Sequence, residues 1–291
     1  MLWSNEIEIH FFKEALKSFA SHEQLFYSIE DRYFAFVPKD FTSKGHTLQS
    51  RNSLVGKFTE KWARDLLNPL AESFGLYAVN NVVCPEIGLP KKSSADLAFC
   101  KSNKTLQKAC DIKLIFEIKM SIVSNYEYKK PNKVIYSGDY TEHKGNPSLL
   151  RSDSMLKAIG KALNIRASGT ASANIPIVIL GNSPITEFYL DKVDYLQQSG
   201  VVQGIWSLNP APTVKEFIKS SKLSAFQTID STDQLRQLIN DLINGDLWYF
   251  SSMLSKEELG KILQAAQKEK DNVSKAEKFL SLLRRGLNDE N

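Results

Sequence analysis

The segment from residue 112 to residue 123, IKLIFEIKMSIV, constrains the fold of this chain more than any other. Every even position from Ile112 to Ile122 is apolar, and the odd positions 113, 117, 119 and 121 are polar, with Ile115 as the exception. A period of two is that of a β-strand, whose side chains point alternately to opposite faces of a sheet. The pattern predicts a strand with one face in the core and the other free for chemistry.

Apolar residues elsewhere follow helical or strand spacing. Helices are predicted over residues 5–20, 52–74 and 191–198 and from residue 152 onward, and strands over 77–84, 95–100, 175–180 and 201–208. The order helix, three strands, helix, strand predicts an α/β core.

Two of these helices have distinct apolar stripes, which we expect to face the core. The helix over residues 52–74 can be capped by Asn52 or Ser53 and is predicted to end at Gly75. Its stripe consists of Leu54, Phe58, Trp62, Leu66 and Leu70. The stripe of the helix that begins near residue 152 consists of Met155, Leu156, Ile159 and Leu163.

These patterns divide the chain into three regions. Residues 1–50 are a helical and irregular extension, residues 51–210 the α/β core, and residues 211–291 mainly helical, with helices expected near 213–220, 231–244, 255–268 and 274–286. Inside the core, residues 124–149 are polar, aromatic and interrupted by proline and glycine. So long a connection within a compact domain is usually functional or disordered.

Composition narrows the class of protein. No apolar run reaches about 18 residues, so we expect no membrane span. The N-terminus lacks the pattern of a secretory signal, and the three cysteines lack metal-ligand spacing, which favours a cytoplasmic protein with reduced thiols. The formal net charge of +4 permits nucleic-acid binding without implying it. Many lysines fall between residues 91 and 133, and an ordinary solvated lysine-rich face would explain them equally well.

Asp96, Glu117 and Lys119 form the pattern that carries chemistry. Glu117 and Lys119 stand two apart on the predicted strand and therefore share a face, and Asp96 lies on a neighbouring predicted strand. Cutting a phosphodiester requires a deprotonated water, neutralised charge on phosphorus and a stabilised leaving oxygen. Mg²⁺ held by carboxylates, with a lysine near the water, can supply all three. The alternative is a solvated sheet face with a cross-strand salt bridge.

Asp96, twenty intervening residues and then Glu117-Ile118-Lys119 resemble the PD-(D/E)XK nuclease superfamily, whose pattern is an acid on one strand and (D/E)-x-K on the next. The resemblance covers about residues 50–210, and the proline that usually precedes the acid is Ala95 here. It implies a restriction-endonuclease-like core, with a helix, a mixed central sheet, a helix and a strand, to which peripheral and C-terminal helices are added.

The resemblance also implies roles for residues. Asp96 and Glu117 would bind one or two Mg²⁺ ions, the carbonyl of Ile118 would add a ligand, and Lys119 would orient or activate the water. The products would carry 5′-phosphate ends. Glu60 resembles the glutamate that many members carry on the helix before the sheet. A surface glutamate paired with Arg64, four residues later, remains an open alternative for Glu60.

Within the superfamily, the layout looks most like a type II restriction endonuclease, usually a homodimer that matches a palindromic DNA site. Arg151-Ser152-Asp153-Ser154, where Arg151, Asp153 and Lys157 are candidates for DNA contact, resembles a base-reading stretch of some such enzymes, although a simple helix cap is an equal alternative. Lys92 and Ser93, just before Asp96, are candidates for phosphate contact. Candidates in the connection 124–149 are Asn125, Tyr126, Lys129, Lys130, Asn132, Lys133, Tyr140 and His143.

Three functions follow from the sequence. The first is a sequence-specific, Mg²⁺-dependent endonuclease of double-stranded DNA. The second is a structure-selective repair or junction nuclease of the same fold. The third is a non-catalytic DNA-binding protein, which the intact acid, acid and lysine set disfavours.

Overall fold

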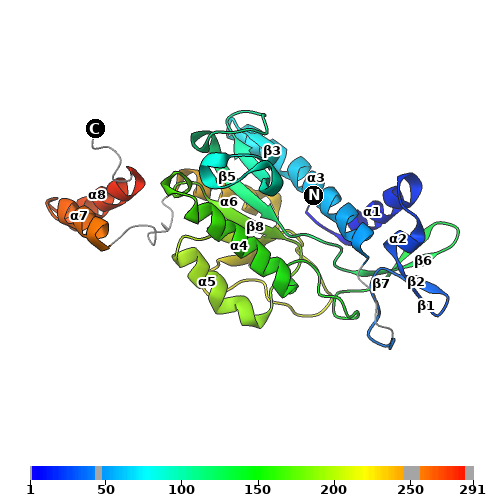
Figure 1. Ribbon diagram of the computed structural model, residues 1–291. Helices are drawn as coiled ribbons and strands as arrows, with labels where there is room; N and C mark the ends of the chain where they lie inside the picture. Colours follow the sequence, from blue (N-terminus) through cyan, green and yellow to red (C-terminus); the bar gives the residue numbers. More distant parts are fainter. Residues whose placement is uncertain (1, 43–47, 246–255, 286–291) are drawn as a thin grey trace.

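The computed structural model describes residues 2–42, 48–245 and 256–285 (Figure 1). The longer helices are α1 (Asn5–Ser18), α3 (Gln49–Ser73), α4 (Ser152–Ala167), α5 (Leu190–Gln198), α6 (Thr232–Asn244), α7 (Lys256–Ala266) and α8 (Asn272–Arg285). The central strands are β3 (Tyr77–Val82), β4 (Ala95–Cys100), β5 (Ile112–Ile118), β8 (Ile177–Gly181), β9 (Gly204–Ser207) and β10 (Phe226–Thr228).

The central sheet has the strand order β10-β9-β8-β5-β4-β3. β3, β4 and β5 pair antiparallel, whereas β5, β8, β9 and β10 pair parallel, so the sheet is mixed. Helices cover both of its faces. The predicted α/β class is therefore confirmed at the level of a mixed central sheet with flanking helices.

The strand with the period-two pattern lies in the middle of this sheet but is shorter than predicted. β5 ends at Ile118, not at residue 123, although the backbone N–H of Lys119 still donates to Leu180 O at 2.7 Å. The expectation of one free face was wrong for most of the strand, because helices cover both faces. Ile115 packs with Ile177 and Ile179 on one side, and Phe116 packs in the core on the other. The polar face opens only where β5 ends.

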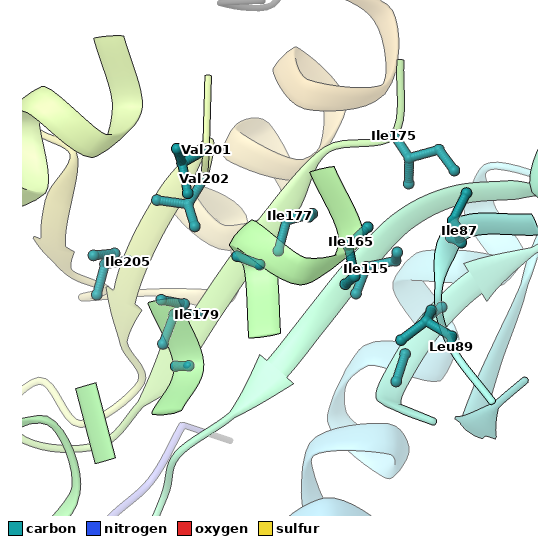
Figure 2. Close-up of a cluster of buried hydrophobic side chains, with 14 of the residues drawn as sticks. Ile87, Leu89, Ile115, Ile165, Ile175, Ile177, Ile179, Val201, Val202 and Ile205 are labelled. Carbon is teal, nitrogen blue, oxygen red and sulfur yellow. The ribbon is translucent and has the colours of Figure 1, made fainter. Parts of the chain in front are cut away.

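Helices α4 and α5 cover the first face of the sheet. Figure 2 shows Ile165 of α4 close to Ile115 of β5 and Ile177 of β8. The predicted stripe of α4 was wrong in part: Met155 is buried, but Leu156 and Leu163 are exposed. The buried side instead consists of Met155, Ala158, Ala162, Ile165 and Arg166.

Helices α3 and α6 cover the second face. α3 begins three residues before the predicted cap at Asn52, and it ends before Gly75, whose φ of +69° suits glycine. Its predicted stripe is displaced by one position. The side pressed on the core consists of Val55, Thr59, Ala63, Leu67, Leu70 and Ala71, and only Leu70 of these was in the predicted stripe. Leu54, Phe58, Trp62 and Leu66 are partly buried.

A second, antiparallel sheet lies beside the core with the order β1-β2-β6-β7. Its strands are β1 (Tyr27–Ile29), β2 (Arg32–Phe34), β6 (Asn125–Lys129) and β7 (Lys133–Gly138), and the short helix α2 (His22–Leu25) precedes it. Residues 124–149, which were interpreted as a long loop, instead contain the β6–β7 hairpin. Phe11 and Phe12 of α1 pack between this sheet and Val55 of α3.

The region after residue 210 does more than was expected of it. The predicted helix at 213–220 is wrong, because these residues form no helix. β10 extends the central sheet, and Leu235 and Ile239 of α6 join its core. α7 and α8 correspond to the predicted helices near 255–268 and 274–286, whose residues 255 and 286 lie outside the described part. No helix within the described residues is long and apolar enough to span a membrane.

Candidate active site

The pairing of β4 with β5 brings the two predicted acids together. Leu97 lies opposite Phe116 in the antiparallel register, which places Asp96 and Glu117 at the same end of the strand pair. Asp96 Oδ2 accepts a hydrogen bond from the backbone N–H of Ile118 at 2.8 Å, which ties the side chain of one strand to the backbone of the next. The strand pattern of the sequence alone had predicted that Asp96 and Glu117 lie close together.

Lys119 completes the predicted set at the end of β5. Its Nζ lies 2.5 Å from Glu117 Oε1, 3.5 Å from Asp96 Oδ2 and 3.1 Å from the carbonyl oxygen of Ile118. All three oxygens belong to the residues that the family resemblance assigns to the metal. The ammonium group of Lys119 therefore lies at a point on which three hard oxygen donors converge.

Lys161 of α4 is a member of the centre that the sequence reasoning missed. Its Nζ lies 2.9 Å from Asp96 Oδ1 and 2.6 Å from Glu117 Oε2. The contact with Glu117 Oε2 is an ion pair without hydrogen-bond alignment. The sequence held a signal for this residue: Lys161 stands three after Ala158 and four before Ile165, both buried against the sheet. Lys161 was missed because the predicted stripe of α4 was chosen from its larger apolar side chains, which placed a different side of the helix against the sheet.

The two acids differ, because Glu117 is buried and Asp96 is partly buried. Burial raises the pKa of Glu117, and the nearby Asp96 raises it further, against the opposing effect of the two lysines. Burial acts in the same direction on Asp96, but the ammonium groups of Lys119 and Lys161 outweigh it and lower the pKa of Asp96. The hydrogen bond from Ile118 contributes to this difference. Asp96 is therefore the first of the pair to ionise.

Glu60 lies on α3 beside this centre. The side-chain amide of Asn80 on β3 donates to both Glu60 O at 3.3 Å and Asp96 O at 3.0 Å, which fixes the helix next to the strand. Burial raises the pKa of Glu60, and the charge of Asp96 adds to this. Arg64, the alternative partner, pairs with Asp65 instead, at 2.7 Å. Glu60 thus faces the charged cluster and not a surface arginine.

The donor set suits a hard cation. Asp96 Oδ2, Glu117 Oε1 and Ile118 O surround one point, and carboxylate and carbonyl oxygens are the ligands that Mg²⁺ prefers. No group of three or more His, Cys, Asp or Glu side chains within residues 2–42, 48–245 and 256–285 is arranged to hold a metal ion. Any metal here would rely on two carboxylates and a main-chain carbonyl, with other positions left to water and substrate.

A cleft of about 430 Å³ opens beside Lys119. Its walls come from the start of α3, the segment after β5 and the start of α4, and Arg51, Asn52, Asn146 and Arg151 contribute polar groups. Arg51 is buried and lies over the rings of Tyr27 and Phe36. Arg151 is exposed, and its Nε donates to Asp153 Oδ1 at 2.6 Å. Of the candidate centre, Ile118 and Lys119 line this cleft.

The other residues predicted to contact DNA fall into separate groups. Arg151 lines the cleft, and Asp153 and Lys157 form an ion pair at 3.6 Å on the first turns of α4. Lys92 and Ser93 are exposed in the turn before β4. The exposed residues Lys129, Lys130, Asn132 and Lys133 form the tip of the β6–β7 hairpin, which Figure 1 places with α1 and α2, away from α4. Tyr140 is partly buried in the segment after β7.

Three candidates from the connection 124–149 are not available for DNA contact. Asn125, Tyr126 and His143 are almost fully buried. His143 stacks on Phe36 with ring centroids 4.1 Å apart, and its Nε2 lies 2.9 Å from Val123 O. The sequence suggested these residues because the segment was interpreted as an exposed loop.

Comparison with known proteins adds no further guide. No protein-family model, curated protein or solved structure matches this chain. Function is therefore inferred from the geometry of the site.

Proposed function

We propose that this protein is a Mg²⁺-dependent endonuclease of double-stranded DNA, of the site-specific type II restriction class. The observation that carries the proposal is the meeting of Asp96, Glu117 and Lys119 at the end of two paired strands, beside an open cleft. The side chains of Asp96 and Lys119 are less than one-fifth exposed and that of Glu117 is 6% exposed, which argues against a solvated surface salt bridge.

The fold agrees with this class in its order of elements. The helix α3, the antiparallel strands β3, β4 and β5, the helix α4 and the parallel strand β8 come in the order of a restriction-endonuclease-like core, with the β6–β7 hairpin inserted between β5 and α4. The two acids lie on the second and third of those strands. We therefore assign the chain to that fold type as part of the same proposal.

In this assignment Asp96, Glu117 and the carbonyl of Ile118 hold Mg²⁺. The bound ion would neutralise charge on the scissile phosphate and lower the pKa of a coordinated water. A bond forms between the water oxygen and phosphorus, and the bond from phosphorus to O3′ breaks. One proton leaves the water and one is taken up by O3′, which yields a 5′-phosphate and a 3′-hydroxyl.

The remaining residues position and polarise the reactants. Lys119 lines the cleft, and its ammonium group would donate to the attacking water and the phosphate oxygen. Glu60 has a raised pKa, caused first by burial and then by Asp96, which brings its carboxylate closer to the range in which it can accept a proton at neutral pH. Asp96 stays ionised at neutral pH because its pKa is lowered, as a metal ligand requires.

Recognition of a DNA sequence is assigned to the cleft wall at the start of α4. Arg151 carries a guanidinium group held in place by Asp153, and arginine can donate two hydrogen bonds to guanine in the major groove. A palindromic site would be cut by two copies of the centre related by a two-fold axis, so we propose a homodimer. Sedimentation of the purified chain with and without a cognate duplex tests this, and a monomer in both cases would contradict it.

Incubation of the purified protein with Mg²⁺ and phage or plasmid DNA tests the activity directly. We expect discrete fragments, and run-off sequencing of their ends should give one site with 5′-phosphates. Lys119→Ala should keep the fold and lose cutting. The matched control is Lys113→Ala, on the exposed start of the same strand, which should cut normally. A smear of products would favour a nuclease without sequence preference, and no cutting at all would favour a non-catalytic DNA-binding protein.

Arg151→Ala tests the assignment of sequence reading. Each good bidentate contact to a base contributes about 1–3 kcal/mol of discrimination, so this variant should cut secondary sites about 10- to 100-fold more readily relative to the cognate site. Lys113→Ala, which is exposed and not part of the cleft lining, is the control and should keep the site preference. Unchanged discrimination in Arg151→Ala would remove Arg151 from the reading set.

A further inference from the structure

The acidic pair of the candidate active site has two sides, and a different lysine lies on each. Lys119 Nζ contacts Asp96 Oδ2 and Glu117 Oε1, together with the carbonyl oxygen of Ile118. Lys161 Nζ contacts the other two carboxylate oxygens, Asp96 Oδ1 and Glu117 Oε2. The four oxygens of one carboxylate pair thus define two cation positions, as they would in a site that binds two metal ions.

The two positions differ in what they offer a divalent ion. The position near Lys119 has three protein oxygens, of which one is a neutral carbonyl, and it adjoins the cleft. The position near Lys161 has two carboxylate oxygens and is covered by α4. Lys119 lines the adjoining cleft, whereas Lys161 does not and lies on α4 between Ala158 and Ile165, which are both buried.

We propose that Lys161 is a fixed counter-cation that takes the place of a second metal ion, so that each active site binds a single Mg²⁺. This inference rests on the proposed nuclease function. The single ion replaces the ammonium group of Lys119 among Asp96 Oδ2, Glu117 Oε1 and Ile118 O. Lys161 stays between Asp96 Oδ1 and Glu117 Oε2 and contributes the positive charge that a second ion would otherwise supply.

The charges of the cluster agree with one ion and not with two. Asp96, Glu117 and Glu60 carry at most three negative charges, and Lys119 and Lys161 carry two positive ones. With all three acids ionised, one Mg²⁺ would leave a single positive charge, which matches the single negative charge of a phosphodiester. A second Mg²⁺ would have to lie close to the ammonium group of Lys161 or displace it, and repulsion between like charges at such distances is large in a partly buried site.

Metal stoichiometry measured without DNA tests this directly. The probe is Mn²⁺, followed by titration calorimetry and by the electron paramagnetic resonance signal of the free ion. We expect the full-length wild-type chain to bind one ion per active site and Lys161→Met to bind two. Lys161→Arg keeps the charge and should bind one, and the exposed Lys157→Met is the matched control and should also bind one.

Cleavage kinetics supply the second readout. The cutting rate of the wild type should rise with the first power of Mg²⁺ concentration below saturation. In Lys161→Met we expect the cutting rate to fall by up to about 10²-fold. The rate should then depend on nearly the second power of the Mg²⁺ concentration, because a second ion must fill the position that the lysine has left. Circular dichroism and thermal melting establish that each variant is folded, and Lys161→Gln takes the place of Lys161→Met if that variant does not fold.

The outcomes separate this inference from the proposed function. Two ions per site in the wild type, or one ion in the folded neutral variants, would overturn the role of Lys161. A wild type that cuts DNA with two ions keeps the nuclease and loses only this inference. A chain that binds one ion, gains a second in Lys161→Met and cuts no DNA keeps the cation role and loses the nuclease function. A wild type that binds no ion overturns both.

Discussion

Two glutamates among the described residues are almost completely buried, and they are held in opposite ways. Glu117 is 4% exposed and Glu8 is 1% exposed. The partners of Glu117 are the ammonium groups of Lys119 and Lys161. The partners of Glu8 are four uncharged donors: Trp3 Nε1 at 2.8 Å, Val123 N at 2.7 Å, Ser124 N at 3.0 Å and Tyr126 OH at 2.9 Å.

The difference separates a site where one bound cation can replace another from a structural contact. In that contact, which we call the clamp, Glu8 of α1 holds the backbone of Val123 and Ser124. The lysines that hold Glu117 are long side chains, and a divalent cation can replace one of them without any change in the backbone. Two of the donors that hold Glu8 are backbone N–H groups, which cannot move without unfolding the segment. Burial raises the pKa of Glu8 to about 7, because the uncharged donors only partly offset the loss of water. A charged, replaceable environment suits chemistry, and a neutral, fixed one suits architecture.

The two glutamates act on the same stretch of chain. Glu117 lies near the end of β5, and Glu8 binds the backbone at residues 123 and 124, just before β6 begins. Lys119 lies between the two anchored points. The clamp on α1 therefore fixes the far end of the segment whose near end carries the candidate active site.

The largest effect should come from exchanging each glutamate for glutamine. In Glu117→Gln the centre loses a charged metal ligand, so we expect cutting to fall by about 10²–10³-fold or more while the chain stays folded. In Glu8→Gln we expect each folded molecule to keep its cutting rate. Plasmid cleavage normalised to folded protein measures both. The contrast fails if Glu8→Gln loses as much activity as Glu117→Gln at equal folded concentration.

The sequence was sufficient for the parts of the site that depend on strand period. Glu117 and Lys119 share a face because they are two residues apart, and Asp96 adjoins them because consecutive strands pair. Lys161 could not be found in the same way, because it depends on which side of α4 faces the sheet. Large apolar residues suggested one side of α4, but the buried side includes the small Ala158 and Ala162, which a search for large apolar side chains does not select.

The second sheet was missed for a related reason. Its strands come from two parts of the chain, before α3 and after β5, and each is short. Polar and aromatic residues alternate in β6 without an apolar run, so the segment suggested an exposed loop. Only long-range packing, with Phe12 of α1 against Tyr126, makes it a strand. The burial of Asn125 and His143 follows from that packing and has no local sequence signal.

The next effect is on the pH dependence of stability. The pKa of Glu8 is about 7 in the folded protein and near 4.5 when the chain is unfolded, so the folded state holds the proton more tightly. The resulting stability is fully present below pH 4.5 and is lost as the pH rises through about 7. Linkage gives a loss of order 3 kcal/mol over this window.

Glu8→Gln should lack this loss, although it is less stable overall because its amide group must face a backbone N–H. The free energy of unfolding from urea titrations, taken as the difference between wild type and variant, should therefore change by about 3 kcal/mol between pH 4.5 and 7.5. Burial lowers the pKa of His143 to about 4, so its contribution to the free energy of unfolding increases as the pH rises. This contribution is the same in wild type and variant and cancels in the difference. A difference that is constant across this range would contradict the clamp.

The smallest effect should come from removing one of the four donors. Tyr126→Phe deletes the hydroxyl that donates to Glu8 Oε2, but this oxygen still accepts from the backbone of Ser124. A single hydrogen bond contributes about 0.5–1.5 kcal/mol net, so we expect a loss of that size in the free energy of unfolding and no change in cutting. The more exposed Tyr136→Phe should change stability by less than about 0.5 kcal/mol. If Tyr126→Phe lowered cutting more than 10-fold at unchanged stability, the clamp would belong to the active site, and the division between the two glutamates would be wrong.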